Sequence, residues 1–200
     1  MKPSTYTTVG TEGTAKLVVK KSTFLSFAFP AMTVDEVEER VKECRKKYYD
    51  ARHVCYAYVL EADSSLFRGS DNGELSGTAG RPILGTIRAA GLTFTGVIVV
   101  RYFGGIKLGI PGLIRSYRTA AAEALDNAGT VVKTATVPYR VDFGYMAMNS
   151  VMKVFKDMDL PQRGQDFGER CSLQTSVRLS EEASFTDRMS HIEDCAATRL

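Results

Sequence analysis

The spacing of apolar and polar positions predicts alternating strands and helices in the first part of the chain. Two β-branched and aromatic stretches at 15–19 and 23–29 are typical of the strands of a hairpin. A helix is expected next, because Thr33 and Glu36 form a capping box ahead of apolar residues at helical spacing. The alternation at 53–60 indicates a strand. This part of the chain therefore predicts a mixed arrangement of strands and helices.

The next segment is expected to continue the same arrangement. A loop over 61–80 leads to a helix with Pro82 at its first position and Gly91 at its end. The β-branched run 97–100 predicts a buried central strand, and a second helix is expected over 111–129. The segment therefore adds one strand to the core and two helices beside it.

A domain boundary is expected near residues 136–138. The remaining elements are predicted as a strand at 139–143, a helix at 145–157, strands near 162–167 and 171–179, a helix from Ser180 and a strand at 196–200. This βαββαβ order is that of the ferredoxin-like split βαβ arrangement. The sequence therefore predicts an α+β protein, with an N-terminal α/β domain over 1–136 and a small ferredoxin-like domain over 137–200.

Composition changes the picture mainly through the position of charge and glycine. The formal net charge is only +3, and no apolar run is long enough to cross a membrane, so we expect a globular protein without membrane contact. Between 66 and 118, however, seven basic residues stand against two acidic ones. Eleven of the 17 glycines lie between 69 and 112. Function is expected in this basic, glycine-rich segment.

Cysteines and the first residues indicate where the protein resides. The four cysteines show no metal-ligand spacing, so neither a zinc site nor a disulfide framework is expected. The start of the chain lacks the apolar segment of a signal peptide. We therefore expect a cytoplasmic protein with reduced thiols.

Recurring catalytic motifs are missing from the sequence, so no catalytic residue, cofactor or metal site is predicted. His53 and Cys55 share one strand face, which allows a thiol nucleophile, but a buried structural cysteine is the favoured interpretation. Asp71 and Glu74 have the chemistry to hold Mg²⁺ or to act as a base, and the simpler interpretation is a turn.

Anion binding is the stronger signal. Two glycine-rich loops, 77–80 and 104–109, each lead into a helix N-terminus, where free N–H groups and the helix dipole favour an anion. Basic residues there oppose the dipole by about 0.3–1 kcal/mol each, which favours a functional reason for them. The predicted anion- or nucleic-acid-binding residues are Gly80, Arg81, Arg101, Gly104, Gly105, Lys107, Gly109, Arg115 and Arg118, with His53, Asp71, Glu74, Tyr102 and Phe103 in supporting roles.

Three stretches, 51–58, 71–84 and 101–109, closely resemble motifs of the IMPACT/YigZ family, and the resemblance extends over about 14–129. It implies a ribosomal-protein-S5-domain-2-like fold for the first domain and an appended ferredoxin-like domain, both similar to the C-terminal domains of elongation factor G. It also implies a connection with translation, because eukaryotic members bind the activator of a translation-initiation kinase. That activity is tied to an additional N-terminal domain.

The sequence departs from the family pattern at a few positions. Asn72 stands where aspartate is usual, Leu75 where proline is usual, and 110–111 where Thr-Gly is usual. The loss of a carboxylate at 72 weakens a metal-site interpretation.

Three hypotheses follow for function. The first is a non-enzymatic module that binds RNA, the ribosome or a translation-associated protein through the glycine- and arginine-rich surface, with a role in translation regulation. The second is an enzyme acting on a phosphorylated or nucleotide substrate, which requires a deep pocket around His53, Asp71 and Glu74. The third is a protein-interaction regulator whose basic face meets an acidic partner. A purely structural explanation also stays open, in which some of the arginines form ion pairs with Asp71 and Glu74 and bind no ligand.

Overall fold

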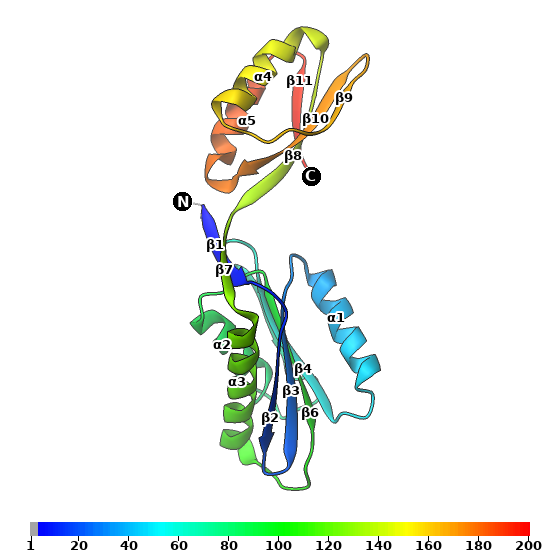
Figure 1. Ribbon diagram of the computed structural model, residues 1–200, viewed down its shortest axis with the longest axis vertical. Helices are drawn as coiled ribbons and strands as arrows, with labels where there is room; N and C mark the ends of the chain where they lie inside the picture. Colours follow the sequence, from blue (N-terminus) through cyan, green and yellow to red (C-terminus); the bar gives the residue numbers. More distant parts are fainter. Residues whose placement is uncertain (1–3) are drawn as a thin grey trace. The chain divides into compact units, whose positions relative to one another are not determined.

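The computed structural model describes residues 4–200 of the chain, so the first residues, on which the expected lack of a signal peptide rests, lie outside it (Figure 1). The chain is a mixed α+β protein and divides into two compact units. The larger spans Tyr6–Lys133, and the smaller comprises Thr134–Leu200 with residues 4 and 5. This division lies three residues before the boundary expected at 136/137, which falls inside a strand.

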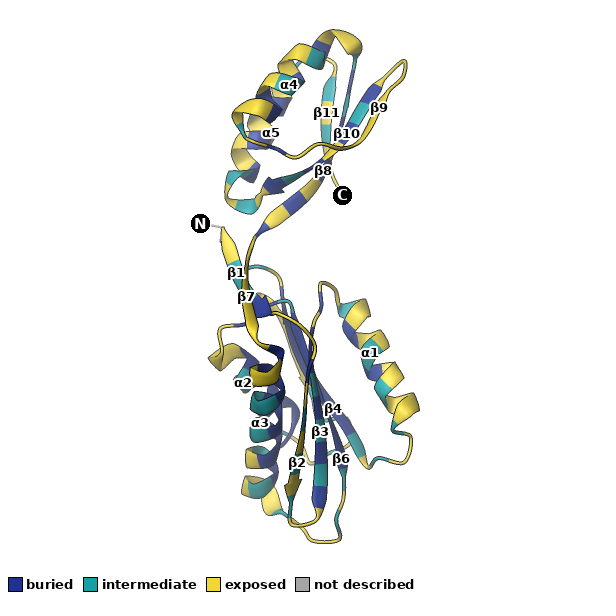
Figure 2. Cartoon of the chain, viewed as in Figure 1, coloured by how far each residue is buried: buried dark blue, intermediate teal, exposed yellow. Residues whose placement is uncertain are grey.

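A five-stranded antiparallel sheet forms the centre of the larger unit. Its strands, in spatial order, are β2 (Gly13–Val19), β3 (Ser22–Pro30), β6 (Thr95–Tyr102), β4 (His53–Leu60) and β5 (Leu66–Ser70). The central place expected for the run 97–100 is confirmed, since β6 lies in the middle of the sheet. Figure 2 shows β4 and β6 buried along most of their length. β1 (Thr5–Val9) and β7 (Thr130–Thr134) pair separately.

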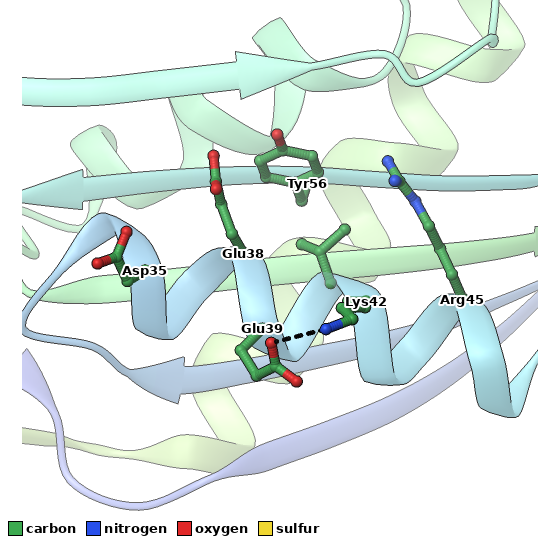
Figure 3. Close-up of a pocket in the computed structure, with 7 residues that line it drawn as sticks. Asp35, Glu38, Glu39, Lys42, Arg45 and Tyr56 are labelled. Atoms are coloured by element: carbon green, nitrogen blue, oxygen red, sulfur yellow. Dashed lines mark hydrogen bonds and ion pairs between the residues drawn. The ribbon is translucent and has the colours of Figure 1, made fainter.

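Helices cover both faces of this sheet. On one face lies α1 (Val34–Lys47), and the expected cap by Thr33 is confirmed, because its hydroxyl accepts a hydrogen bond from the Glu36 N–H. The return bond of the capping box is displaced by one residue, since the Glu36 carboxylate accepts from the N–H of Met32 and not of Thr33. A hollow of about 580 Å³ lies beside α1, and Figure 3 shows its lining side chains. They include three carboxylates and two cations, from Asp35, Glu38, Glu39, Lys42 and Arg45. This face is therefore a poor place for an anion.

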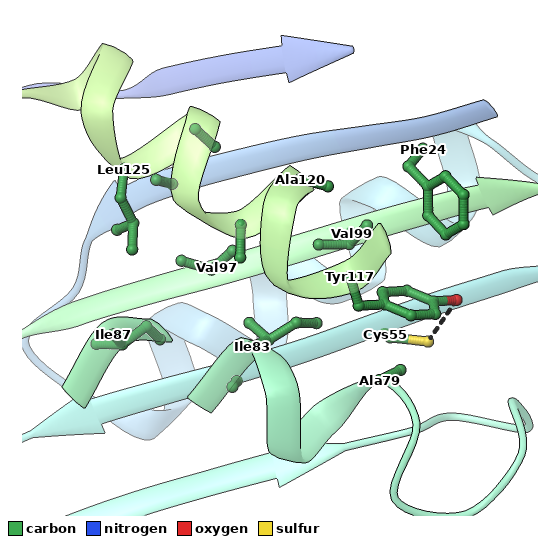
Figure 4. Packing of buried hydrophobic residues seen from close by; sticks show 14 of the residues in the cluster. Phe24, Cys55, Ala79, Ile83, Ile87, Val97, Val99, Tyr117, Ala120 and Leu125 are labelled. Atoms are coloured by element: carbon green, nitrogen blue, oxygen red, sulfur yellow. Dashed lines mark hydrogen bonds between the residues drawn. The ribbon is translucent and has the colours of Figure 1, made fainter. Parts of the chain in front are cut away.

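The opposite face carries α2 (Gly80–Ala89) and α3 (Gly109–Ala128). Alternate residues of β4 supply both cores: Cys55 and Val59 pack with α2 and α3, whereas Val54 and Leu60 face the α1 side. Figure 4 shows the first of these cores, with Tyr117 of α3 beside Cys55. Burial of both sheet faces explains why β4 is apolar over 54–60 and β6 over 97–100.

Two details differ from the sequence-based expectation. The segment expected as a loop contains β5, an edge strand whose residues are mostly exposed and so lack an alternating signal. Pro82 is the third residue of α2, not its first, because the helix begins at Gly80. Gly80 packs so closely on β5 that a Cβ there would lie 2.5 Å from the Ser70 nitrogen.

The smaller unit has the predicted βαββαβ order of elements. They are β8 (Thr136–Phe143), α4 (Met148–Asp157), β9 (Arg163–Phe167), β10 (Cys171–Arg178), α5 (Glu182–Ser190) and β11 (Cys195–Arg199), with one-turn helices η1 (Tyr145–Ala147) and η2 (Leu179–Glu181). The strand order is β11-β8-β10-β9, with antiparallel neighbours. Both helices pack on one core with Phe143, Leu173 and Phe185.

Candidate functional site: an anion pocket at the start of helix α3

The first glycine-rich loop, before α2, is already occupied by a carboxylate of the protein itself. Asp71 accepts hydrogen bonds from the N–H groups of Gly77 (2.8 Å), Ala79 (2.9 Å) and Gly80 (2.8 Å). Burial pushes the pKa of Asp71 upward, but these three backbone hydrogen bonds outweigh it, and the pKa lies below its usual value. The expectation that Gly80 binds an external anion is therefore wrong, because its donor is used internally.

The second glycine-rich loop, between β6 and α3, is not filled in this way. Gly104 is packed, because its N–H donates to the Ser22 hydroxyl at 3.2 Å and a Cβ there would overlap the backbone of Lys21. Gly105 (φ +85°) has open space around its Cβ position, and Gly109 takes a left-handed φ of +71°. The close approach of Gly104 therefore serves the fold, whereas the loop beyond it faces open space.

The N-terminus of α3 has no internal anion. No side chain caps it, and its first turn contains no acidic residue. Among the residues that the structure describes, none accepts a hydrogen bond from the N–H of Gly109 or Ile110, and Pro111 has no N–H. The first N–H groups of a helix lack intrahelical partners and carry the positive end of its dipole. The end of this 20-residue helix is therefore a free donor set.

A pocket of about 610 Å³ opens beside this helix end. Three cations and one carboxylate line it, so its formal charge is +2 with His53 neutral. The rest of the wall is apolar, and three of the apolar side chains are about half exposed. The lining residues are Arg52, His53, Glu74, Leu75, Arg101, Phe103, Lys107, Leu108, Gly109, Ile110 and Leu113.

Glu74 organises the floor of the pocket. Its Oε2 accepts from Arg101 Nη1 at 2.5 Å and from the Tyr117 hydroxyl at 2.9 Å, and its Oε1 lies 3.6 Å from His53 Nε2. The sheet sets this geometry, because His53 and Arg101 are directly opposite each other on β4 and β6. The sequence had left open that some arginines pair with Asp71 or Glu74, and the structure shows this ion pair between Arg101 and Glu74.

Arg101 is buried, with 6% of its surface exposed, yet its hydrogen bonding is incomplete. Its guanidinium lies 5.7 Å from the ring centroids of both Phe24 and Phe103. Nη1 donates to Glu74, whereas the buried Nε has no partner among the described residues. A buried donor without an acceptor costs about 1–3 kcal/mol. Arg101 therefore keeps a hydrogen-bond donor that Glu74 does not use.

Cys55 lies behind this floor and is a structural residue. Its Sγ is 3.0 Å from the Asp71 carbonyl oxygen and 3.4 Å from the Tyr117 hydroxyl oxygen. Burial raises the pKa of the Cys55 thiol to about 12, so the thiol stays protonated at neutral pH. Burial likewise raises the pKa of Tyr117, which remains a neutral donor to Glu74. The thiol nucleophile left open from the sequence has no support here.

The remaining predicted residues do not converge on this pocket. Tyr102 packs on the α1 side and donates its hydroxyl to Asp50 at 2.9 Å. Arg81 and Arg118 are exposed residues outside the pocket lining. Arg115 lines a separate hollow of about 360 Å³ with Lys20. The two loops therefore do not form the single surface that was expected. The structure has instead a pocket at the start of α3 and a second basic hollow, and Leu108 borders both.

Sequence reasoning missed the apolar half of the pocket. Leu75 and Ile110 are 52% and 53% exposed, and both line the pocket. Arg52 was also missed, although it directly precedes His53. Tyr117, which donates to Glu74, was not among the predicted site residues. The exposed apolar rim and the Tyr117 contact with Glu74 left no signal in the sequence.

The fold and pocket define a class of two-unit α+β protein, and comparison with known proteins gives its family. The model of the Impact N-terminal domain matches residues 20–125. The chain is 30% identical to the IMPACT family member YvyE of Bacillus subtilis (strain 168) over 94% of this chain and 86% of that protein. This protein belongs to the IMPACT family, which confirms the family expected from its motifs.

Other relatives agree with this membership. An IMPACT family member of Thermus thermophilus is 42% identical over 63% of this chain and 68% of that protein. YigZ of Escherichia coli (strain K12), also an IMPACT family member, is 30% identical over 86% of this chain and 85% of its own length. A crystal structure of a hypothetical protein superposes with a TM-score of 0.73 at 26% identity, covering 99% and 98% of the two chains.

Two features are absent from the residues that the structure describes. No helix among them has the length and apolarity to cross a membrane. Residues 4–200 also contain no group of three or more His, Cys, Asp or Glu side chains placed to hold a metal ion.

Proposed function

We propose that this protein is a non-enzymatic binding module that binds RNA in the cytoplasm, free or within the ribosome, and acts near translation. The observation that carries the proposal is the free N-terminus of α3, which opens onto a pocket lined by Arg52, Arg101 and Lys107. Phosphate groups bind at such helix ends because N–H donors and the dipole act together. The pocket thus offers RNA a place for its backbone charge.

The pocket also offers a surface for a base. Phe103 is 49% exposed at the pocket and lies beside the Arg101 guanidinium. Single-stranded nucleic acid is bound by basic grooves that carry aromatic side chains, on which bases stack. Unpaired RNA therefore fits this pocket better than a duplex, whose bases are not available for stacking.

The connection with translation rests on family resemblance. We assign the larger unit to the ribosomal-protein-S5-domain-2-like fold and the smaller to the ferredoxin-like fold, which together resemble the C-terminal domains of elongation factor G. The antiparallel order β11-β8-β10-β9 and the βαββαβ connectivity support the second assignment. Similarity to domains of a ribosome-bound factor favours RNA or a translation-associated protein as partner.

Binding of single-stranded RNA, structured RNA and ribosomes at several salt concentrations tests the proposal. Lys107→Ala is expected to weaken binding of single-stranded RNA and to lower the salt slope by about 0.7, the share of one phosphate contact. Lys46→Ala is the matched control, because Lys46 is an exposed lysine in the last turn of α1, away from the pocket. Equal losses in both variants would indicate diffuse charge attraction and overturn the proposal.

One observation favours an enzyme as second candidate. His53 Nε2 lies 3.6 Å from Glu74 Oε1 at the pocket floor, an arrangement able to move a proton on a bound phosphorylated or nucleotide substrate. The third group required by this hypothesis, Asp71, is bound to backbone amides instead. Incubation with nucleotides and phosphate esters, followed by chromatography, tests it: turnover lost in His53→Gln would replace the binding-module proposal.

The protein-interaction regulator remains the third alternative. An acidic protein partner would use the same charges of Arg52 and Lys107. Salt-dependent capture of a protein in nuclease-treated extract, with no binding of purified RNA, would support it against RNA.

A further inference from the structure

We propose that the α3 pocket is a site for one nucleoside monophosphate unit, with the phosphate at the helix end and the base against the apolar rim. The inference rests on the proposed function and gives its ligand chemistry: a free mononucleotide and a phosphorylated RNA end present the same unit. Three features of the pocket carry it, namely the helix end, the orphaned donor of Arg101 and the exposed apolar rim.

The chain itself shows how an anion sits at its other glycine-rich loop. At α2, Asp71 places a carboxylate against the N–H groups of Gly77, Ala79 and Gly80, at 2.8–2.9 Å. At α3 a glycine-rich loop again precedes a helix, but no side chain caps this helix and no carboxylate of the described residues lies in its first turn. An external oxyanion at α3 would accept hydrogen bonds from the N–H groups at the start of the helix, as the Asp71 carboxylate does at α2.

The second feature is the unpaired donor of Arg101. Its guanidinium has five N–H groups in a planar fork, and the structure shows one hydrogen bond, from Nη1 to Glu74. Nε is buried without a partner among the described residues. A fork with one side free is suited to two parallel hydrogen bonds with an oxyanion. Because Glu74 balances the Arg101 charge, Lys107 and Arg52 are left to balance a phosphate.

The third feature excludes a bare inorganic anion as the whole ligand. Leu75, Phe103 and Ile110 are between 49% and 53% exposed, and all three line the pocket. Such a cluster gains by being covered with an apolar or aromatic group. The volume of about 610 Å³ is within the roughly 300–1,000 Å³ of small-molecule sites. A phosphate joined to a flat base has both required parts, since one end is anionic and the other stacks.

Isothermal titration of the full chain with adenosine 5′-monophosphate, adenosine and inorganic phosphate tests this site. The monophosphate is expected to bind most tightly, because it alone fills both parts. Phe103→Ala is expected to weaken monophosphate binding about 5- to 100-fold through lost stacking, while inorganic phosphate binding stays unchanged. Phe67→Ala is the matched control: Phe67 is 44% exposed and stacks with Arg88, outside the pocket.

The two sources of the ligand are separated with short RNAs that carry either a 5′-phosphate or a 5′-hydroxyl. Preference for the phosphorylated end, with competition by the monophosphate, would assign the site to RNA ends. Monophosphate binding without RNA binding would assign it to free nucleotides and overturn the RNA proposal alone. RNA binding that depends on Lys107 but not on Phe103, without monophosphate binding, would overturn this inference and leave the RNA proposal standing.

Discussion

Replacement of Glu74 tests whether the pocket floor is held by its buried ion pair. The side chains of Glu74 and Arg101 are each only 7% exposed, and Glu74 also accepts from Tyr117. Glu74→Leu leaves the Arg101 cation buried without a partner, which costs about 3–5 kcal/mol. Glu74→Gln keeps an acceptor oxygen, so we expect a smaller loss of about 1–3 kcal/mol.

Differential scanning calorimetry measures the effect. For a chain of this size, 1 kcal/mol shifts the melting temperature by about 2–4 °C, so Glu74→Leu is expected to lower the melting of the larger unit by about 6–20 °C. The double variant Glu74→Leu with Arg101→Met is expected to recover most of this loss, because an apolar pair of similar volume replaces a buried ion pair at little cost.

The control is Glu39→Gln, which removes an exposed partner of Lys42 and is expected to leave the melting temperature nearly unchanged. A loss below 1 kcal/mol for Glu74→Leu would show that Arg101 does not depend on Glu74. A double variant as unstable as the sum of its single changes would show that the two side chains are not coupled. Either result would refute the assignment of the floor.

Three further predictions use the surroundings of the pocket. The pKa of Asp71 is lower in the folded protein than the value of about 3.9 in the unfolded chain. The stability that Asp71 contributes is therefore present above about pH 3.9 and is lost as the pH falls toward the folded pKa. The free energy of unfolding of Asp71→Asn, measured against pH, should lack this loss. With a pKa of about 12, the buried Cys55 thiol should alkylate at pH 8 more slowly than the partly exposed Cys44 and Cys195, measured by mass spectrometry, whereas the unfolded, unreduced protein should show four free thiols. Gly80→Ala should lower the free energy of unfolding in urea by about 1–3 kcal/mol, because its Cβ would meet the Ser70 backbone at 2.5 Å.

The elements that the sequence predicted well are those with a strong periodic signal. α1 has a capping residue and an apolar stripe, 53–60 alternates as β4 does, and 97–100 is a continuous apolar run because helices cover both faces of the sheet at β6. β5 left no such signal, because its residues lie at the sheet edge and are mostly exposed. Burial imposes periodicity on a sequence, so an exposed edge strand remains hard to recognise.

The candidate site was predicted in part. His53, Glu74, Arg101, Phe103 and Lys107 line one pocket, as their segment suggested. The sequence did not show the partners of the two carboxylates. The geometry of the turn decides that Asp71 accepts hydrogen bonds from the start of α2, whereas Glu74 forms an ion pair with Arg101. Exposed apolar residues at the rim also have no sequence signature, since a leucine or isoleucine in a loop is equally consistent with the core.

The charges at the pocket set an upper limit on how steeply its RNA affinity depends on salt. Arg101 is neutralised by Glu74, so Arg52 and Lys107 are the pocket cations without an ion pair among the described residues. Two phosphate contacts on a single strand correspond to a slope of about −1.4 in log K against log salt. A longer strand that passes Leu108, which borders both hollows, would also meet Arg115, about 9 Å along α3 from Gly109.

Arg115→Ala is therefore expected to reduce the slope for an RNA of several nucleotides by about 0.7 and to leave mononucleotide binding unchanged. Fluorescence anisotropy at four or more salt concentrations measures both, and Lys46→Ala, at an exposed cation in the last turn of α1, is again the control. An unchanged salt slope in Arg115→Ala would show that the RNA strand does not reach Arg115 and contacts the α3 pocket only. Because Arg115 does not line that pocket, a loss of mononucleotide binding in the same variant would place the phosphate in the Lys20–Arg115 hollow and refute its assignment to the end of α3.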